Sequence, residues 1–206
     1  MAIRTQSISE PIRSGEDVLR LIEILSLLDA MGLLRIDEPI STIDRGVLRQ
    51  AADAAAAAGI GRDLLRRMTV GRLGPRGLSA AIEQLHQALN DSPAPLHEAR
   101  EQLSIFGPEA LAALAGSSPA SLRRYASGLR TAPDRLAARL HWLARVVAEL
   151  RGAYNDAGVR RWFERRRTQL AGRAPAELLT GDWDPADEGP VAILELARGL
   201  RGGGAT

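Results

Sequence analysis

EALAALAGSSPASLRRYASG, residues 109–128, has the spacing of a helix-turn-helix. In that motif two short helices meet at a tight corner, so the residue at their contact must be small and the corner residue must accept a positive φ. Ala112 and Gly116 meet these two requirements, and Leu122 is spaced to point back into the crook. The stretch therefore predicts two helices joined at Gly116.

The second helix of the motif is expected to begin near Pro119, where a missing N–H costs nothing, after a cap supplied by Ser117 or Ser118. Arginine and serine side chains on its outward face suit phosphate and base-edge contacts in a major groove of double-stranded DNA. The residues that we expect to contact DNA are Ser118, Ser121, Arg123, Arg124, Tyr125 and Arg130.

The surrounding charge favours a DNA-binding element over an ordinary helical corner, the alternative that remains because helices rich in Ala and Leu also join at glycine in proteins that bind no nucleic acid. Residues 119–173 contain 13 arginines and four acidic residues, an excess of nine, although the formal net charge of the whole chain is only +2. Basic charge concentrated in this way is typical of a polyanion-binding surface.

Composition predicts an all-α protein with one large or two small domains. The chain has 206 residues, of which 45% are hydrophobic and only 3% aromatic, and its Ala and Leu content favours helices over strands. All 27 basic residues are arginines, which is typical of GC-rich genomes. The absence of Cys excludes disulfides, thiolate chemistry and Cys-based zinc sites.

Location is inferred from what the sequence does not contain. No apolar run approaches the roughly 20 residues of a membrane span, and the N-terminus lacks an apolar core followed by a cleavage site. We therefore expect a cytoplasmic protein without a membrane partner.

The first part of the chain predicts a helical domain of unknown role, residues 1–92. Apolar residues at three- and four-residue steps predict helices at 17–34, 43–58 and 76–89. The first of these is strongly apolar, which favours core packing and leaves a dimer interface as the alternative. The sequence 90–95, NDSPAP, breaks helix twice and marks the domain boundary.

A possible repeat of the corner lies within this first domain, at residues 55–71. Its interpretation is open, because an oligo-alanine run aligns with almost any sequence, and a degenerate second helix-turn-helix is the alternative to chance. The residues that recur at the offsets of the first corner are Ala55, Gly59, Leu65, Arg66, Arg67 and Gly71.

The rest of the chain predicts two further small helical domains and a tail. We expect a helix-turn-helix domain at 93–154, whose last helix, 133–154, has an apolar stripe suited to packing or to pairing in a homodimer. A C-terminal domain at 155–200 follows, and residues 201–206, RGGGAT, are expected to be disordered.

Three groups of residues in the second half match a known pattern: SLRRY from Ser121, RLHWL from Arg139, and RRWFER from Arg160 followed by Leu-x-Gly-x-x-Pro-x-x-Leu-Leu from Leu170. With them, residues 119–197 resemble the Xre/MbcA/ParS family of antitoxins. In that family a helix-turn-helix precedes a small helical toxin-binding domain. The last group carries most of the specificity, because several fixed spacings agree.

The resemblance implies a partner with the RES fold, a toxin that consumes NAD⁺, and repression of the antitoxin's own operon as part of a type II toxin-antitoxin system. Residues 1–92 lie outside it, so a stand-alone transcription regulator and a protein-interaction module without DNA binding are the alternatives. A tryptophan in a small helical domain can also simply fill its core. The residues expected to bind the toxin are Arg160, Arg161, Trp162, Arg165, Trp183 and Arg198.

Catalysis is not expected from this sequence. His86, His97 and His141 are scattered singly, with no acid at ligand spacing, and Gly71-Arg-Leu-Gly-Pro-Arg-Gly lacks the Lys-Ser/Thr of a phosphate-binding loop. We therefore expect no enzyme activity, no metal site and no cofactor.

Overall fold

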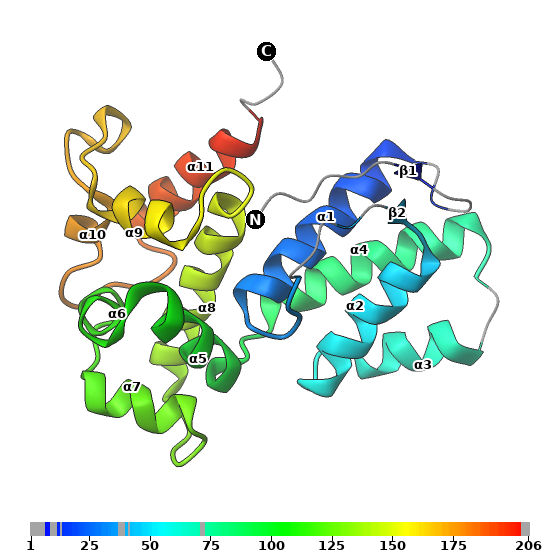
Figure 1. Cartoon of the computed structure of the whole chain (residues 1–206), viewed down its shortest axis with the longest axis horizontal. Helices are drawn as coiled ribbons and strands as arrows, with labels where there is room; N and C mark the ends of the chain where they lie inside the picture. Colours follow the sequence, from blue (N-terminus) through cyan, green and yellow to red (C-terminus); the bar gives the residue numbers. More distant parts are fainter. Residues whose placement is uncertain are drawn as a thin grey trace. The chain divides into compact units, whose positions relative to one another are not determined.

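The computed structural model describes residues 7–8, 12, 14–36, 40, 42–70 and 73–202, and it confirms the all-α class (Figure 1). Eleven α-helices and one 3-10 turn account for most of these ranges. The described strands are two residues each, β1 (Ser7–Ile8) and β2 (Thr42–Ile43), and they pair in parallel.

The chain divides into two compact units, Ala2–Ser92 and Pro93–Thr206. The division falls at the proline-rich link between the fourth helix, which ends at Asp91, and the fifth, which begins at Pro95. Within the second unit, residues of the segments 93–154 and 155–200 pack together, since the long helix α8 (Asp134–Leu150) contacts both α5 (Pro95–Phe106) and α11 (Glu188–Gly202).

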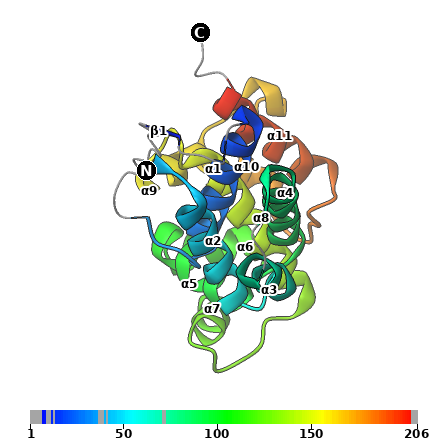
Figure 2. The same cartoon turned by 90° about the vertical axis from the view of Figure 1, so that its right-hand side faces the viewer.

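The first unit is built around an apolar helix, as the spacing predicts. Leu21, Leu25 and Leu28 of α1 are at most 1% exposed, and α1 packs against α4 (Figure 1). The helices α2 and α3 lie side by side (Figures 1 and 2). The four helices are α1 (Gly15–Ala30), α2 (Arg45–Ala57), α3 (Arg62–Val70) and α4 (Pro75–Asp91).

The second unit has α8 at its centre. Its residues Leu140, Leu143 and Val147 are completely buried, which fits the apolar stripe seen in the sequence. The elements are α5 (Pro95–Phe106), α6 (Pro108–Ala115), α7 (Pro119–Ala126), α8 (Asp134–Leu150), α9 (Asp156–Glu164), η1 (Thr168–Leu170), α10 (Pro175–Leu178) and α11 (Glu188–Gly202).

The expected tail begins later than predicted. Helix α11 continues to Gly202, so the first two residues of the segment 201–206 are helical, and residues 203–206 lie outside the described residues. In the described ranges no helix combines the length and the apolar character that crossing a bilayer requires.

Candidate nucleic-acid interface

The corner between α6 and α7 has the geometry that residues 109–128 predict. Gly116 follows the last residue of α6 with φ 65° and ψ 45°, the left-handed conformation that glycine adopts without a Cβ clash. The N–H of Ser117 donates to the carbonyl of Ala112 (3.0 Å), a bond that closes the end of the helix. Ser118 then caps α7, because its Oγ accepts from the N–H of Ser121 (3.1 Å).

The crook of this corner is filled by small and apolar side chains. Leu122 is completely buried and Ala112 is 8% exposed, so the two helices approach closely on this side. Arg100 of α5 holds the far end of α7, since its guanidinium donates to the carbonyl of Ala126 (2.9 Å). Helix α7 is therefore fixed at both ends by contacts within its own unit.

The outward side of α7 carries the predicted cations. Arg123 and Arg124 are exposed, as is Ser118 at the start of the helix. Ser121 is half-buried, and its hydroxyl accepts from the hydroxyl of Ser118 (2.9 Å). Of the residues expected to contact DNA, these four lie along one end and one side of the helix.

Tyr125 is a correction to the expected contact set. It is only 5% exposed, because its position on α7 turns it toward the core rather than outward. Its ring instead lies beneath the guanidinium of Arg130, 5.8 Å from the ring centroid, and Arg130 itself is exposed. Tyr125 can therefore position a cation near α7 but is not placed to contact DNA directly.

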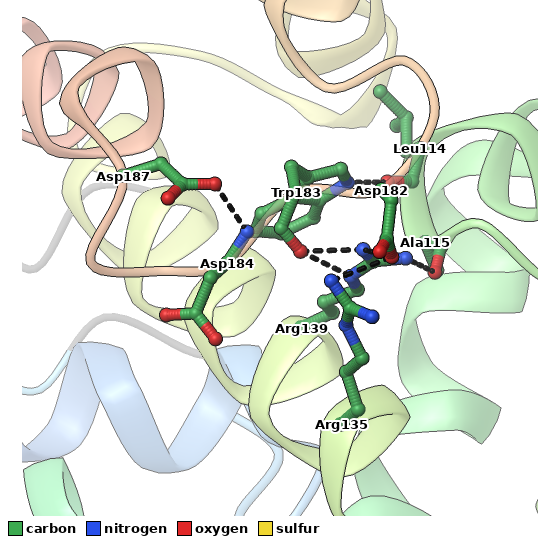
Figure 3. A network of polar contacts seen from close by, with 8 residues as sticks. All are labelled: Leu114, Ala115, Arg135, Arg139, Asp182, Trp183, Asp184 and Asp187. Carbon is green, nitrogen blue, oxygen red and sulfur yellow. Dashed lines mark hydrogen bonds and ion pairs between the residues drawn. The ribbon is translucent and has the colours of Figure 1, made fainter.

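Arg139, in the middle of α8, joins this corner to the segment that precedes α11 (Figure 3). Its side chain is only 5% exposed. Its Nη1 donates to the carbonyl of Ala115 (3.2 Å) at the end of α6, and its Nε donates to the carbonyl of Trp183 (2.8 Å). Its Nη2 pairs with the carboxylate of Asp182 (3.2 Å).

Trp183 makes a second tie to the same corner. Its indole N–H donates to the carbonyl of Leu114 (3.0 Å; Figure 3). Its ring also meets that of Trp142 of α8 edge-on, with the ring centroids 5.1 Å apart. The guanidinium of Arg139 lies over the Trp183 ring, 4.9 Å from its centroid. Two adjacent carbonyls at the end of α6 are thus satisfied by side chains from α8 and from the 181–187 loop.

The electrostatics of this network depend on Asp182. Burial lowers the pKa of Arg139, and the nearby charge of Arg135 lowers it further, whereas Asp182 acts in the opposite direction. The carboxylate of Asp182 also pairs with Arg135 (2.5 Å), whose side chain is 52% exposed. The single negative charge of this exposed aspartate is therefore shared between two arginines on consecutive turns of α8.

The two tryptophans expected to bind the toxin are also corrected by the structure, because both are buried. Trp183 is 3% exposed and Trp162 is 2% exposed, and Trp162 packs edge-on against Phe163 at 5.3 Å. Each fills the core of the second unit. Neither can serve as a surface anchor in this conformation.

The four arginines expected to bind the toxin are all exposed. Arg160 nevertheless donates to the carbonyl of Ile105, and Arg198 lies 3.9 Å from a carboxylate oxygen of Glu149. Arg161 and Arg165 lie at the end of α9. They are consequently the better placed pair for contact with another protein.

Sequence reasoning missed the central role of Arg139, which it noted only as part of a matching pattern. No local signal could identify it, because its partners lie 24 and 44 residues away along the chain. It also missed the buried pair formed by His141 and Glu98, whose Nδ1 and Oε1 are 2.7 Å apart. Burial raises the pKa of Glu98, while the hydrogen bond to His141 lowers it.

No protein-family model, curated protein or solved structure matches the chain. The described residues also contain no group of three or more metal-ligating side chains close enough to hold an ion.

Proposed function

We propose that this chain is the DNA-binding antitoxin of a type II toxin-antitoxin pair, which neutralises an NAD⁺-consuming toxin of the RES type and represses its own operon. The observation that carries the DNA-binding part is the left-handed corner at Gly116, followed by a capped helix with exposed Arg123 and Arg124. The resemblance of residues 119–197 to the Xre/MbcA/ParS antitoxins supports the remainder.

In the proposed complex, α7 enters the major groove and its two exposed arginines contact phosphates or guanine edges. A homodimer would place two copies of α7 in successive major grooves, roughly 34 Å apart. Each phosphate neutralised by an arginine adds about 0.9 to the slope of log affinity against log salt. The binding is accordingly expected to weaken steeply as salt rises.

Removing the two cations of α7 tests this proposal. We expect the double change Arg123→Ala and Arg124→Ala to weaken binding to the duplex upstream of the chain's own gene by roughly 100-fold, with a shallower salt slope. Helical content should be unchanged, because alanine favours helix. The measurement is a gel shift at several salt concentrations, with circular dichroism as the check on folding.

The matched control removes two arginines from α9 instead. The double change Arg161→Ala and Arg165→Ala lowers the net charge by the same amount in the same unit, and should leave DNA affinity within a few-fold of the original. Equal losses in both double variants would show a general charge effect and would count against α7 as the DNA-reading helix.

The toxin-binding part of the proposal is tested by co-purification with the same two double variants. If a RES-type reading frame adjoins the gene, we expect its product to co-purify with this chain, less strongly after the Arg161→Ala and Arg165→Ala change and undiminished after the α7 change. Exposed arginines at the end of α9 support this expectation, since arginine is enriched in interface hot spots. Failure to co-purify, with DNA binding intact, would instead favour a stand-alone regulator.

A further inference from the structure

The first unit contains a second corner at which the leading helix ends with a hydrogen bond that corresponds to one at the Gly116 corner. After α2, the N–H of Ile60 donates to the carbonyl of Ala55 (2.9 Å), and Gly59 between them has φ 93°. At the first corner the corresponding donor is Ser117 and the corresponding acceptor is Ala112, around Gly116. This pattern is the glycine-dependent end of a helix.

The helices that follow also begin at the same offset. Helix α3 starts at Arg62, three residues after Gly59, and α7 starts at Pro119, three residues after Gly116. Helices α2 and α3 pack on each other across their corner, as α6 and α7 do (Figures 1 and 2). Apart from Gly71, which lies outside the described residues, the offsets found in the sequence thus fall on a corner of similar construction.

The crook of the second corner differs in one residue. The offsets align Leu65 with Leu122, but Leu65 is half-buried and its neighbour Leu64 is only 6% exposed. A second positive-φ glycine, Gly61 (φ 67°), directly before α3 accompanies this shift. As in α7, a leucine of the first turn of α3 is buried, here Leu64. The opposite side of α3 therefore faces solvent.

That opposite side is basic. Arg62, Arg66 and Arg67 are exposed and share this side of α3 with Asp63, and Arg62 and Arg66 lie one turn apart. Arg66 and Arg67 stand at the offsets of Arg123 and Arg124, and both members of each pair are exposed.

The contacts of Arg66 and Arg67 leave both guanidinium groups accessible to solvent. The side chain of Arg66 is 77% exposed and lies 3.6 Å from the carboxylate of Asp63, an ion pair that solvent screens strongly. Arg67 donates to the side-chain oxygen of Gln84 on α4 (2.9 Å), which orients its guanidinium. Both therefore remain able to contact a phosphate.

We propose that α3 is a second DNA-binding helix, so that the two units of one chain each contact a segment of double-stranded DNA. The corner supplies the helix-turn-helix frame and the arginines supply the phosphate contacts, as α6 and α7 do in the second unit. The proposal goes beyond the function proposed above: the contacts assigned to α3 rest on residues of the first unit, and only the use of two DNA segments rests also on the proposal for α7. It gives the N-terminal residues outside the antitoxin resemblance a specific role.

The full-length chain allows a direct test with the duplex from upstream of its own gene and a random-sequence duplex of equal length. The double change Arg66→Gln and Arg67→Gln is expected to lower affinity for the upstream duplex about tenfold and to reduce the salt slope by roughly 2. It should also shorten the footprint on that duplex. The change Asp63→Asn removes the one anion from this side of α3 and should raise affinity a few-fold.

Arg20→Gln is the control, because it removes a cation from α1 of the same unit, where the guanidinium pairs with Glu83 (2.9 Å). The proposal would be overturned if the Arg66→Gln and Arg67→Gln variant lost no more affinity per charge removed than Arg20→Gln does and left the footprint unchanged. An Asp63→Asn variant that binds no better than the original would also overturn it. This change removes the exposed ion pair with Arg66, which contributes little to the stability of the fold.

The outcomes also separate this proposal from the one for α7. Weaker binding after the α3 change, with normal binding after the α7 change, would identify α3 as the DNA-binding helix and refute the assignment of α7. The reverse result would refute the proposal for α3 alone. If neither change affects binding, both assignments fail.

Discussion

Replacing Gly116 with alanine is expected to lower the free energy of unfolding of the second unit by about 3 kcal/mol, far more than an ordinary surface substitution. Two costs combine. An L-residue is strained at φ 65°, and a Cβ at this position would collide with Nη1 of Arg139. To relieve the collision the guanidinium must move away from the carbonyl of Ala115. Denaturant unfolding followed by circular dichroism measures the loss.

Gly172 provides the matched control for the collision. It also has a positive φ, of 76°, but a Cβ added there would meet no atom within 4 Å. Gly172→Ala should therefore cost only the backbone strain, about 1 kcal/mol. Similar losses for the two alanine variants would mean that the guanidinium of Arg139 does not constrain the corner.

Replacing Arg139 with methionine is expected to lower the free energy of unfolding by about 3 kcal/mol, because the buried cation and its hydrogen bonds are lost. Methionine keeps an aliphatic side chain of similar length, so the packing changes little. The carbonyls of Ala115 and Trp183 would then lack the donor that now satisfies them. We further expect weaker binding to the upstream duplex, although Arg139 is too buried to contact DNA itself. Denaturant unfolding and the gel shift are the two measurements.

Arg135→Met is the control for this change, since Arg135 pairs with the same carboxylate, that of Asp182, from a largely exposed position. Exposed ion pairs contribute roughly 0 to 1 kcal/mol, so this variant should unfold almost as the original does. An Arg139→Met variant as stable as Arg135→Met, with unchanged DNA affinity, would show that the buried network supports neither the fold nor the corner.

The fold was largely predictable because its helices begin and end with local signals. Pro95, Pro108, Pro119 and Pro175 each stand in the first turn of a helix, and Gly116 ends one. These residues act through their own backbone geometry, so a single sequence is sufficient to locate them. The direction of the Arg123 and Arg124 side chains followed from the same helical spacing.

The candidate site was less predictable because burial depends on residues far apart in the chain. Tyr125, Trp162 and Trp183 were expected at interfaces, yet each is covered by elements that the sequence does not place beside it. An aromatic residue has the same local pattern in a core as in an interface. Arg139 illustrates the opposite error, since a charged residue on an amphipathic helix is normally solvated.

Because Trp183 and Arg139 link Leu114 and Ala115 to the last part of the chain, we expect the two halves of this unit to change together in evolution. A recombination event that exchanged only the last thirty or so residues, to change the protein that is recognised, would also have to supply an indole and a carbonyl at the right places. Without the indole the Leu114 carbonyl at the end of α6 would lose its donor, and without the carbonyl of Trp183 the buried guanidinium of Arg139 would lose an acceptor. The exposed side of this segment is therefore free to diverge in sequence, whereas its inner side is constrained by its contacts with the end of α6.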